Sequence, residues 1–349
     1  MATDYLPIGD WATVEPNGSV DVQSMDQAIA VLASQDPEVG DTSALVVVHN
    51  GQIVREMYGP DAGVDSTLIS WSIAKTITQA LVGMAVDDGL LSLDQQNLFP
   101  EWENDERSTI TLQHLLNMAS GLEWREDYVD DQASDVIDML FGDNEFSGDH
   151  AAFAMAKKLE ATPGTKYSYS SGTTNIITKL LARSLGETSG SSQVTEAFMQ
   201  SRLFGPLGMT SATPRFDRSG NFVGSSYVYA TARDFARFGL LYLNNGAWGD
   251  RQILTRDWVR FTGTVFAHDD DNGFDYGGHM WISPDDEGSM LSLGYQGQHI
   301  WISPRRDLVL VRLGVSDASI APHLHAQLLR IVRAFPARQV DLGNDGTSE

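Results

Sequence analysis

Apolar positions recur along the chain at the two periods that distinguish helices from strands. Residues 42–59 contain two apolar strands on either side of Asn50-Gly51, a dipeptide typical of a two-residue hairpin turn. Residues 297–314 repeat this design around a Pro-Arg-Arg-Asp turn. Helical spacing dominates the region between the two hairpins. The pattern predicts one antiparallel sheet, assembled from both ends of the chain and covered by helices.

Five stretches have the spacing of amphipathic helices. In the stretch 68–95, apolar residues at positions 73, 77, 80, 81, 84 and 85 recur at helical spacing, as expected for a helix that faces the core. Three of the other stretches end at a glycine, which favours the end of a helix. The remaining four predicted helices cover residues 111–121, 173–186, 231–246 and 322–335.

The order of these elements predicts an α/β fold in two parts. Residues 1–86 and 215–337 would form the central antiparallel sheet and its flanking helices, and residues 87–214 would form an all-helical insertion. A chain of 349 residues is long enough for this arrangement. Residues 338–349 are polar and are expected to be disordered.

The excess of acidic over basic residues bears on which binding partners the protein can have. The chain has 23 basic and 47 acidic residues, a net charge of −24, and only five of the basic residues are lysines. Such a surface argues against nucleic acid or an anionic membrane as the partner. Adaptation to salt and an ordinary acidic composition both explain it. The absence of cysteine excludes disulfides, thiolate nucleophiles and zinc–thiolate sites.

Apolar runs such as 44–48 are the length of a strand and fall far short of the ~20 residues that cross a membrane. Residues 1–11 have neither the basic nor the apolar part of a secretory signal. We therefore expect a cytoplasmic protein, unless a signal preceded this sequence.

The start of the predicted helix within residues 68–95 carries a pair of residues that helix stability does not explain. Ser72 and Lys75 fit the S-x-x-K pattern of serine acyl-transfer enzymes. A lysine in a first turn opposes the helix dipole, but burial and the dipole would both lower its pKa and free its amine to accept a proton. The helix end would also offer N–H groups to an oxyanion. A capping serine beside a lysine that extends to solvent stays open as the alternative.

A second signal is Tyr169-Ser170-Ser171, directly before a predicted helix. No histidine lies in a catalytic motif, and a tyrosine near a lysine could serve as the base instead. The alternative is that Ser170 or Ser171 caps the helix while Tyr169 packs against it.

A third signal is the glycine-punctuated stretch 289–304. Gly294 and Gly297 allow a backbone to approach a ligand closely, and free N–H groups there could complete an oxyanion hole. A plain hairpin bend is the alternative. The acidic stretch 269–278 lacks the spacing of a calcium-binding loop, so we expect a solvated surface loop there.

Taken in order, five segments resemble recurrent segments of the serine β-lactamase and penicillin-binding-protein superfamily. In particular they resemble its class C-related esterase and amidase branch, which includes the hydrolases of 6-aminohexanoate (nylon) oligomers. The resemblance covers roughly residues 42–313. The five segments are SWSIAKTITQALVGMAVDDGLL, TLQHLLNMASGLEW, PGTKYSYSSG, YATARDFARFGLLYLNNGAWGDRQIL and GYQGQHIWISP.

The resemblance implies a β-lactamase-like fold and a role for each matching residue. Ser72 would be the acylated nucleophile, Lys75 its proton-exchanging partner, and Tyr169 a general base or acid. The backbone N–H groups of Ser72 and Tyr295 would form the oxyanion hole. Tyr128 and Trp281 would shape the substrate cleft, although either could be an ordinary partly buried aromatic residue. The full set of expected substrate-binding residues is Tyr128, Ser171, Trp281, Ser292 and Gly294.

Two departures from the family pattern bear on the substrate. Ser171 stands where penicillin-recognising members carry asparagine, and Ser292-Leu293-Gly294 stands where they carry K-T-G. The missing lysine is the cation that would hold a β-lactam carboxylate. A small-molecule ester or amide substrate is therefore favoured over the alternative, a β-lactamase or penicillin-binding DD-peptidase.

The alternative outside enzymes is a catalytically silent ligand-binding protein on the same scaffold. The resemblance implies no metal and no cofactor, and it allows a homodimer.

Overall fold

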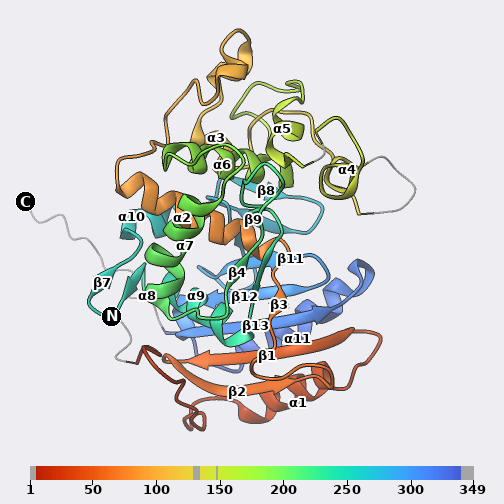
Figure 1. Cartoon of the computed structure of the whole chain (residues 1–349). Helices are drawn as coiled ribbons and strands as arrows, with labels where there is room; N and C mark the ends of the chain where they lie inside the picture. Colours follow the sequence, from red (N-terminus) through yellow and green to blue (C-terminus); the bar gives the residue numbers. More distant parts are fainter. Residues whose placement is uncertain (1–4, 129–133, 147, 339–349) are drawn as a thin grey trace, which may run out of the picture.

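The computed structural model describes residues 5–128, 134–146 and 148–338. Of the segment expected to be a disordered tail, 338–349, all but the first residue lies outside this description. The centre of the molecule is an eight-stranded antiparallel sheet with the strand order β2-β1-β13-β12-β11-β10-β9-β8 (Figure 1). The strands are β1 (Asp41–His49), β2 (Gln52–Tyr58), β8 (Ala267–Asp269), β9 (Phe274–Tyr276), β10 (Trp281–Ile282), β11 (Met290–Gly294), β12 (Gln298–Ser303) and β13 (Leu308–Val315).

Strands from opposite ends of the chain lie side by side in this sheet. β1 pairs with β2 on one edge and with β13 on the other, in a register that runs from Asp41 opposite Val315 to His49 opposite Leu308. The predicted antiparallel sheet from both termini is thereby confirmed. Three short strands form a second sheet, and two more form a separate hairpin. These are β3 (Leu68–Ile69), β5 (Val228–Ala230) and β4 (Thr213–Pro214), and then β6 (Ala247–Trp248) and β7 (Arg251–Gln252).

The turn between β1 and β2 follows from its sequence. Asn50 and Gly51 have φ angles of 52° and 76°, both in the left-handed region that a two-residue hairpin turn of this kind requires. A Cβ on Gly51 would lie 1.7 Å from the carbonyl oxygen of Tyr5, so the close approach of the N-terminal segment also demands glycine.

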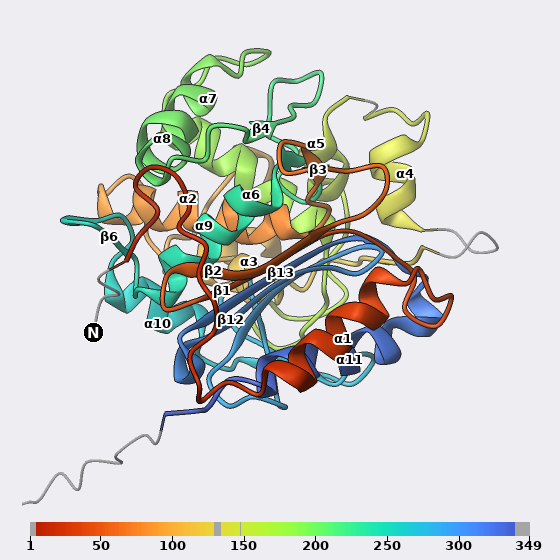
Figure 2. The same cartoon turned by 90° about the horizontal axis from the view of Figure 1, so that it is seen from below.

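Helices cover both faces of the sheet (Figure 2). α1 (Val22–Ala33) packs with α11 (Ala321–Arg333) on one face, and α2 (Ile73–Asp87) and α9 (Ala232–Leu243) lie on the other. Side chains alternate along each strand. Val46 and Val48 therefore join the apolar core under α2, whereas Leu45 and Val47 join the core under α1 and α11.

The middle of the chain is mainly helical. The predicted helix over 111–121 is shorter than expected, because it ends at Leu116 and the backbone turns left-handed at Met118, with φ 54°. No helix among the described residues combines the length and the apolar character needed to cross a membrane. The remaining helices are η1 (Pro100–Trp102), η2 (Glu106–Thr109), α3 (Leu112–Leu116), α4 (Asp135–Phe141), α5 (His150–Met155), α6 (Ser171–Ser184), α7 (Gln193–Met199), η3 (Gln200–Phe204), α8 (Gly205–Leu207), α10 (Arg256–Thr262), η4 (Pro304–Arg306) and η5 (Ala318–Ile320).

Candidate active site

A cleft of about 690 Å³ opens at the start of α2, between the β8–β11 part of the sheet and the segments that lead into the helical region. Most of the residues predicted to form the site meet here. Those that line the cleft are Ser72, Tyr128, Tyr169, Trp281, Gly294 and Tyr295.

Ser72 occupies the cap position of α2, but its side chain makes no capping hydrogen bond. It instead accepts a hydrogen bond of 2.8 Å from Nζ of Lys75. The residue before it, Trp71, has a φ angle of 43°, a backbone conformation that residues other than glycine rarely adopt. The hydroxyl of Ser72 therefore faces the cleft from a tight turn, and capping does not account for this serine.

Lys75 is only 2% exposed, so it does not extend to solvent. Besides Ser72, its Nζ donates to Oγ of Ser171 at 2.9 Å and to the carbonyl oxygen of Ser225 at 3.1 Å. Burial lowers the pKa of this amine to about 8, and the nearby charge of Glu126 opposes part of that fall. The neutral amine, which can accept a proton, is thus accessible near physiological pH.

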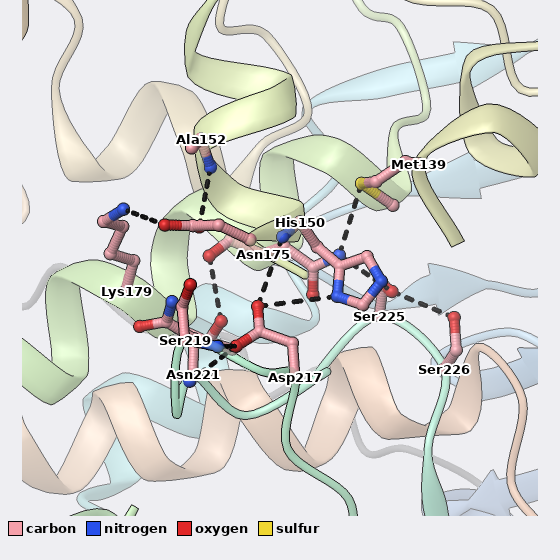
Figure 3. A network of polar contacts seen from close by, with 12 residues as sticks. Met139, His150, Ala152, Asn175, Lys179, Asp217, Ser219, Asn221, Ser225 and Ser226 are labelled. Atoms are coloured by element: carbon pink, nitrogen blue, oxygen red, sulfur yellow. Dashed lines mark hydrogen bonds and ion pairs between the residues drawn. The ribbon is translucent and has the colours of Figure 1, made fainter. Parts of the chain in front are cut away.

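A polar network joins the segment that contains Asp217 and Ser225 to the helices α5 and α6 (Figure 3). Nδ2 of Asn175, on α6, donates to Oγ of Ser225 at 3.2 Å. Earlier in the same segment of chain, a carboxylate oxygen of Asp217 accepts a hydrogen bond of 3.2 Å from the backbone N–H of His150, at the start of α5. The loop that supplies one acceptor of Lys75 is therefore tied to two helices.

Tyr169 lies against both the lysine and the cleft wall. Nζ of Lys75 is 4.9 Å from the centre of its ring, and the ring of Trp281 stacks on it at 5.2 Å. Burial raises the pKa of the Tyr169 hydroxyl, as do the charges of Glu126 and Asp269, while hydrogen bonding with Ser72 and Trp281 opposes the rise. Tyr169 is consequently a neutral phenol at pH 7.

The two serines after Tyr169 have different hydrogen-bond partners. Ser170 caps α6, since its Oγ accepts the backbone N–H of Thr173 at 2.9 Å. Ser171 is buried and does not line the cleft. Its hydroxyl lies between Lys75 and Glu126, so it contacts Lys75 where the sequence predicted a contact with substrate.

Glu126 is one of the residues of this site that the sequence did not predict. Its carboxylate accepts four hydrogen bonds: from Oγ and N of Ser171 at 2.5 and 2.9 Å, from the hydroxyl of Tyr128 at 2.9 Å and from Nε1 of Trp124 at 2.6 Å. It also lines the cleft. In the sequence it stands in a run of charged residues typical of exposed surface. Its proximity to Tyr128 was the one available signal.

Tyr295 follows the last residue of β11, beside the start of α2. A Cβ on Gly294 would lie 2.5 Å from the carbonyl oxygen of Ser70, so only glycine allows this approach. The backbone hydrogen bonds of the described turns and caps engage neither the N–H of Ser72 nor that of Tyr295. The side chain of Tyr295 stacks on Tyr128, with ring centres 4.7 Å apart.

Ser292 is not brought to the cleft. It is 1% exposed, its hydroxyl shares a hydrogen bond of 2.7 Å with Thr76 on α2, and it is absent from the cleft lining. The structure therefore gives no support to a contact between Ser292 and substrate. The position of the family's lysine is filled by a hydroxyl that joins β11 to α2.

In the acidic stretch expected to be a solvated surface loop, residues 270–273 do form an exposed turn, but the stretch also contains the end of β8 and all of β9, and it lines one side of the cleft. Asp269, Asp270 and Asp271 line the cleft together with Glu126, and no lysine or arginine of the described chain is among the lining residues. In the same part of the chain, no group of three or more histidine, aspartate or glutamate side chains is arranged to hold a metal ion.

Comparisons with known proteins identify the family of this chain. The Beta-lactamase family matches residues 36–330. The 6-aminohexanoate-dimer hydrolase of Paenarthrobacter ureafaciens is 26% identical over 317 residues, which cover 85% of this chain and 79% of that protein.

Two solved structures share the fold. One, provisionally described as a 6-aminohexanoate-dimer hydrolase from Bacillus anthracis, has a TM-score of 0.74 at 21% identity, with 96% of this chain and 91% of that chain covered. The other, a family VIII carboxylesterase, has a TM-score of 0.68 at 14% identity, with 92% and 98% covered. Since the family match spans most of the sequence, this chain belongs to the Beta-lactamase family.

Proposed function

We propose that this protein is a serine hydrolase that cleaves ester or amide bonds of small substrates through an acyl-enzyme on Ser72. The observation that carries the proposal is the buried amine of Lys75, 2.8 Å from the Ser72 hydroxyl in an open cleft. A lysine of lowered pKa beside a serine is an activated nucleophile pair. Family membership and the names of the similar proteins, a dimer hydrolase and a carboxylesterase, support the same reaction class.

The proposed acylation assigns one step to each group. The neutral amine of Lys75 takes the proton of Ser72 while Oγ attacks the carbonyl carbon. The N–H groups of Ser72 and Tyr295 stabilise the oxyanion. Tyr169 donates its proton to the departing alcohol or amine, and the ammonium of Lys75 then returns a proton to the phenolate. In deacylation the neutral amine of Lys75 takes a proton from the attacking water, and the resulting ammonium returns a proton to Oγ of Ser72 as the acyl group leaves.

The opposite pKa shifts favour Lys75 as the base and Tyr169 as the acid. Burial lowers the pKa of Lys75 to about 8, whereas burial and nearby carboxylates raise that of Tyr169 above its ordinary value. A tyrosinate base would have to form against those charges, while a neutral phenol is ready to donate.

The charge of the cleft favours neutral or cationic substrates over anionic ones. Within the described part of the chain, four carboxylates and no lysine or arginine line the cleft, and the ammonium of Lys75 is buried and already bonded to three acceptors. A β-lactam or a peptidoglycan stem peptide would bring its carboxylate against this wall, where the one basic side chain of the described lining, His268, already pairs with Asp275.

A substrate panel tests the function and separates it from its alternatives. We expect turnover of a neutral p-nitrophenyl ester, faster turnover of a matched ester with a quaternary ammonium, and little hydrolysis of an anionic ester or a chromogenic cephalosporin. Mass spectrometry of a quenched reaction should find the acyl group on the peptide that contains Ser72. Rapid cephalosporin hydrolysis would establish the β-lactamase alternative, and no adduct with any substrate would establish a silent scaffold.

Replacement of Tyr169 by phenylalanine should separate amides from activated esters. The variant cannot protonate a leaving group, which matters for an amine and little for p-nitrophenolate. We expect kcat/KM to fall about 10²- to 10⁴-fold for an anilide or alkyl amide, and much less for the p-nitrophenyl ester. Equal losses on both substrates would contradict a general-acid role and indicate that Tyr169 assists attack by Ser72.

A further inference from the structure

The amine of Lys75 has one acceptor for each hydrogen of its ammonium form: Oγ of Ser72, Oγ of Ser171 and the carbonyl oxygen of Ser225. When the amine loses a proton, one of these three contacts must reverse, because the new lone pair needs a donor. Catalysis requires that the reversed contact be the one to Ser72, whose hydroxyl then points its hydrogen at the base. The other two groups must remain acceptors.

The contact to Ser225 cannot reverse, since a carbonyl group has no hydrogen to donate. The contact to Ser171 could reverse, because a hydroxyl group rotates and can donate or accept. Glu126 prevents this. Its Oε1 lies 2.5 Å from Oγ of Ser171, and a carboxylate accepts only, so the hydrogen of Ser171 is held on Glu126 and away from Lys75.

We propose that Glu126 is a positioning residue that directs the lone pair of neutral Lys75 onto Ser72 by keeping the Ser171 hydroxyl an acceptor. This inference rests on the proposed acyl transfer at Ser72. Glu126 itself is held by the side chains of Trp124 and Tyr128. The two hydrogen bonds therefore point the same way: Lys75 donates to Ser171, and Ser171 donates to Glu126. We call this pair of hydrogen bonds the relay.

The charge of Glu126 acts on the same lysine. The titratable groups that face Lys75 are Glu126, Tyr169 and His279. His279 is neutral, because burial lowers its pKa to about 3, and Tyr169 is a neutral phenol. Glu126 is the group of these three whose charge raises the pKa of Lys75. Removing that charge should lower the pH at which the amine becomes neutral.

A glutamine at position 126 would reverse the relay. Oε2 of Glu126 accepts two N–H groups, from Ser171 and Trp124, which cannot turn into acceptors. The amide oxygen of glutamine must therefore take that side, which leaves its NH₂ group facing the Ser171 hydroxyl. Ser171 would then accept from glutamine and turn its own hydrogen toward Lys75, in competition with Ser72.

The test is the pH profile of kcat/KM for a neutral p-nitrophenyl ester. For Glu126→Gln we expect the acidic limb to move to lower pH by about one unit, and the plateau at high pH to fall about 10- to 100-fold. Glu126→Asp keeps a carboxylate, and it should keep the acidic limb at its wild-type pH even if the shorter side chain lowers the plateau. Asp127→Asn is the matched control, since this neighbour pairs with Arg125 and does not line the cleft, and its profile should match the wild type.

A double-mutant cycle with Ser171→Ala gives the second readout. In the wild type, loss of the Ser171 hydroxyl removes an acceptor and should lower the plateau about 10-fold. In the Glu126→Gln background it removes a competing donor, so the plateau should stay the same or rise.

Equal effects of Ser171→Ala in both backgrounds would overturn the inference, and so would an unchanged acidic limb in Glu126→Gln. Thermal melts confirm that each variant is folded. If the proposed function itself failed, activity would survive in Ser72→Ala, an outcome that the Glu126 variants do not produce.

Discussion

Ser72→Ala is expected to lower kcat/KM for ester hydrolysis by about 10⁴-fold or more, because no other nucleophile replaces the lost oxygen. The hydroxyl makes no helix-capping bond, so its loss should leave the melting temperature close to that of the wild type. The measurement is ester turnover together with the mass of the acyl adduct, which should disappear.

Ser184→Ala is the matched control for this variant. Ser184 lies at the far end of α6 and bonds only within its own helix, to the carbonyl oxygen of Leu181. Its replacement should leave kcat/KM at the wild-type value. Substantial turnover by Ser72→Ala beside a normal control would refute the acyl-enzyme mechanism.

Lys75→Met should be nearly as damaging, with a fall of about 10³- to 10⁴-fold in kcat/KM, because methionine fills the same buried space without a basic group. The wild type requires the neutral amine, so its activity should rise with pH through about 8 and level off above it. In the Lys75→Met variant, the residual activity should no longer rise with pH in this range. Lys179→Met removes a lysine that pairs with Asp149 outside the cleft, and it should retain the wild-type profile.

The Lys75→Met substitution should also change how the free energy of unfolding depends on pH. The pKa of Lys75 falls from 10.5 to about 8 on folding, so between these two pH values the unfolded chain binds more protons than the folded chain. Raising the pH across this window should therefore stabilise the wild type relative to Lys75→Met, by about 3 kcal/mol in total. Denaturant unfolding at pH 7.5 and 10.5 measures it. A difference that stays constant would mean that Lys75 is not buried as described.

Much of the fold could be predicted from local sequence. Asn50-Gly51 defines its own turn, and the apolar stripe of α2 identifies a helix that faces the core. The helix near residue 111 was predicted too long, because its apolar spacing continues beyond the point where Met118 adopts a left-handed backbone. Local spacing cannot register such a turn, since tertiary contacts decide it.

The candidate site was predictable only where a residue belongs to a recognisable motif. Ser72 and Lys75 are such residues, and the structure places them in direct contact. Glu126 is not one, because a carboxylate in a charged segment looks solvated until the fold sets it against Ser171. The acidic side of the cleft at Asp269 was not predicted for the same reason, since its position depends on how β8 and β9 pair at the edge of the sheet.

The pairing of β1 with β13 has a consequence for biosynthesis. A ribosome releases β1 long before β13, so the sheet beneath α2 stays incomplete until β13 has emerged. Contacts so distant in sequence are typical of slow-folding proteins, which expose apolar surface to aggregation in the meantime. We therefore expect nascent chains that stop before residue 308 to be bound by chaperones or degraded, with the sheet beneath Ser72 completed only after β13 has been made.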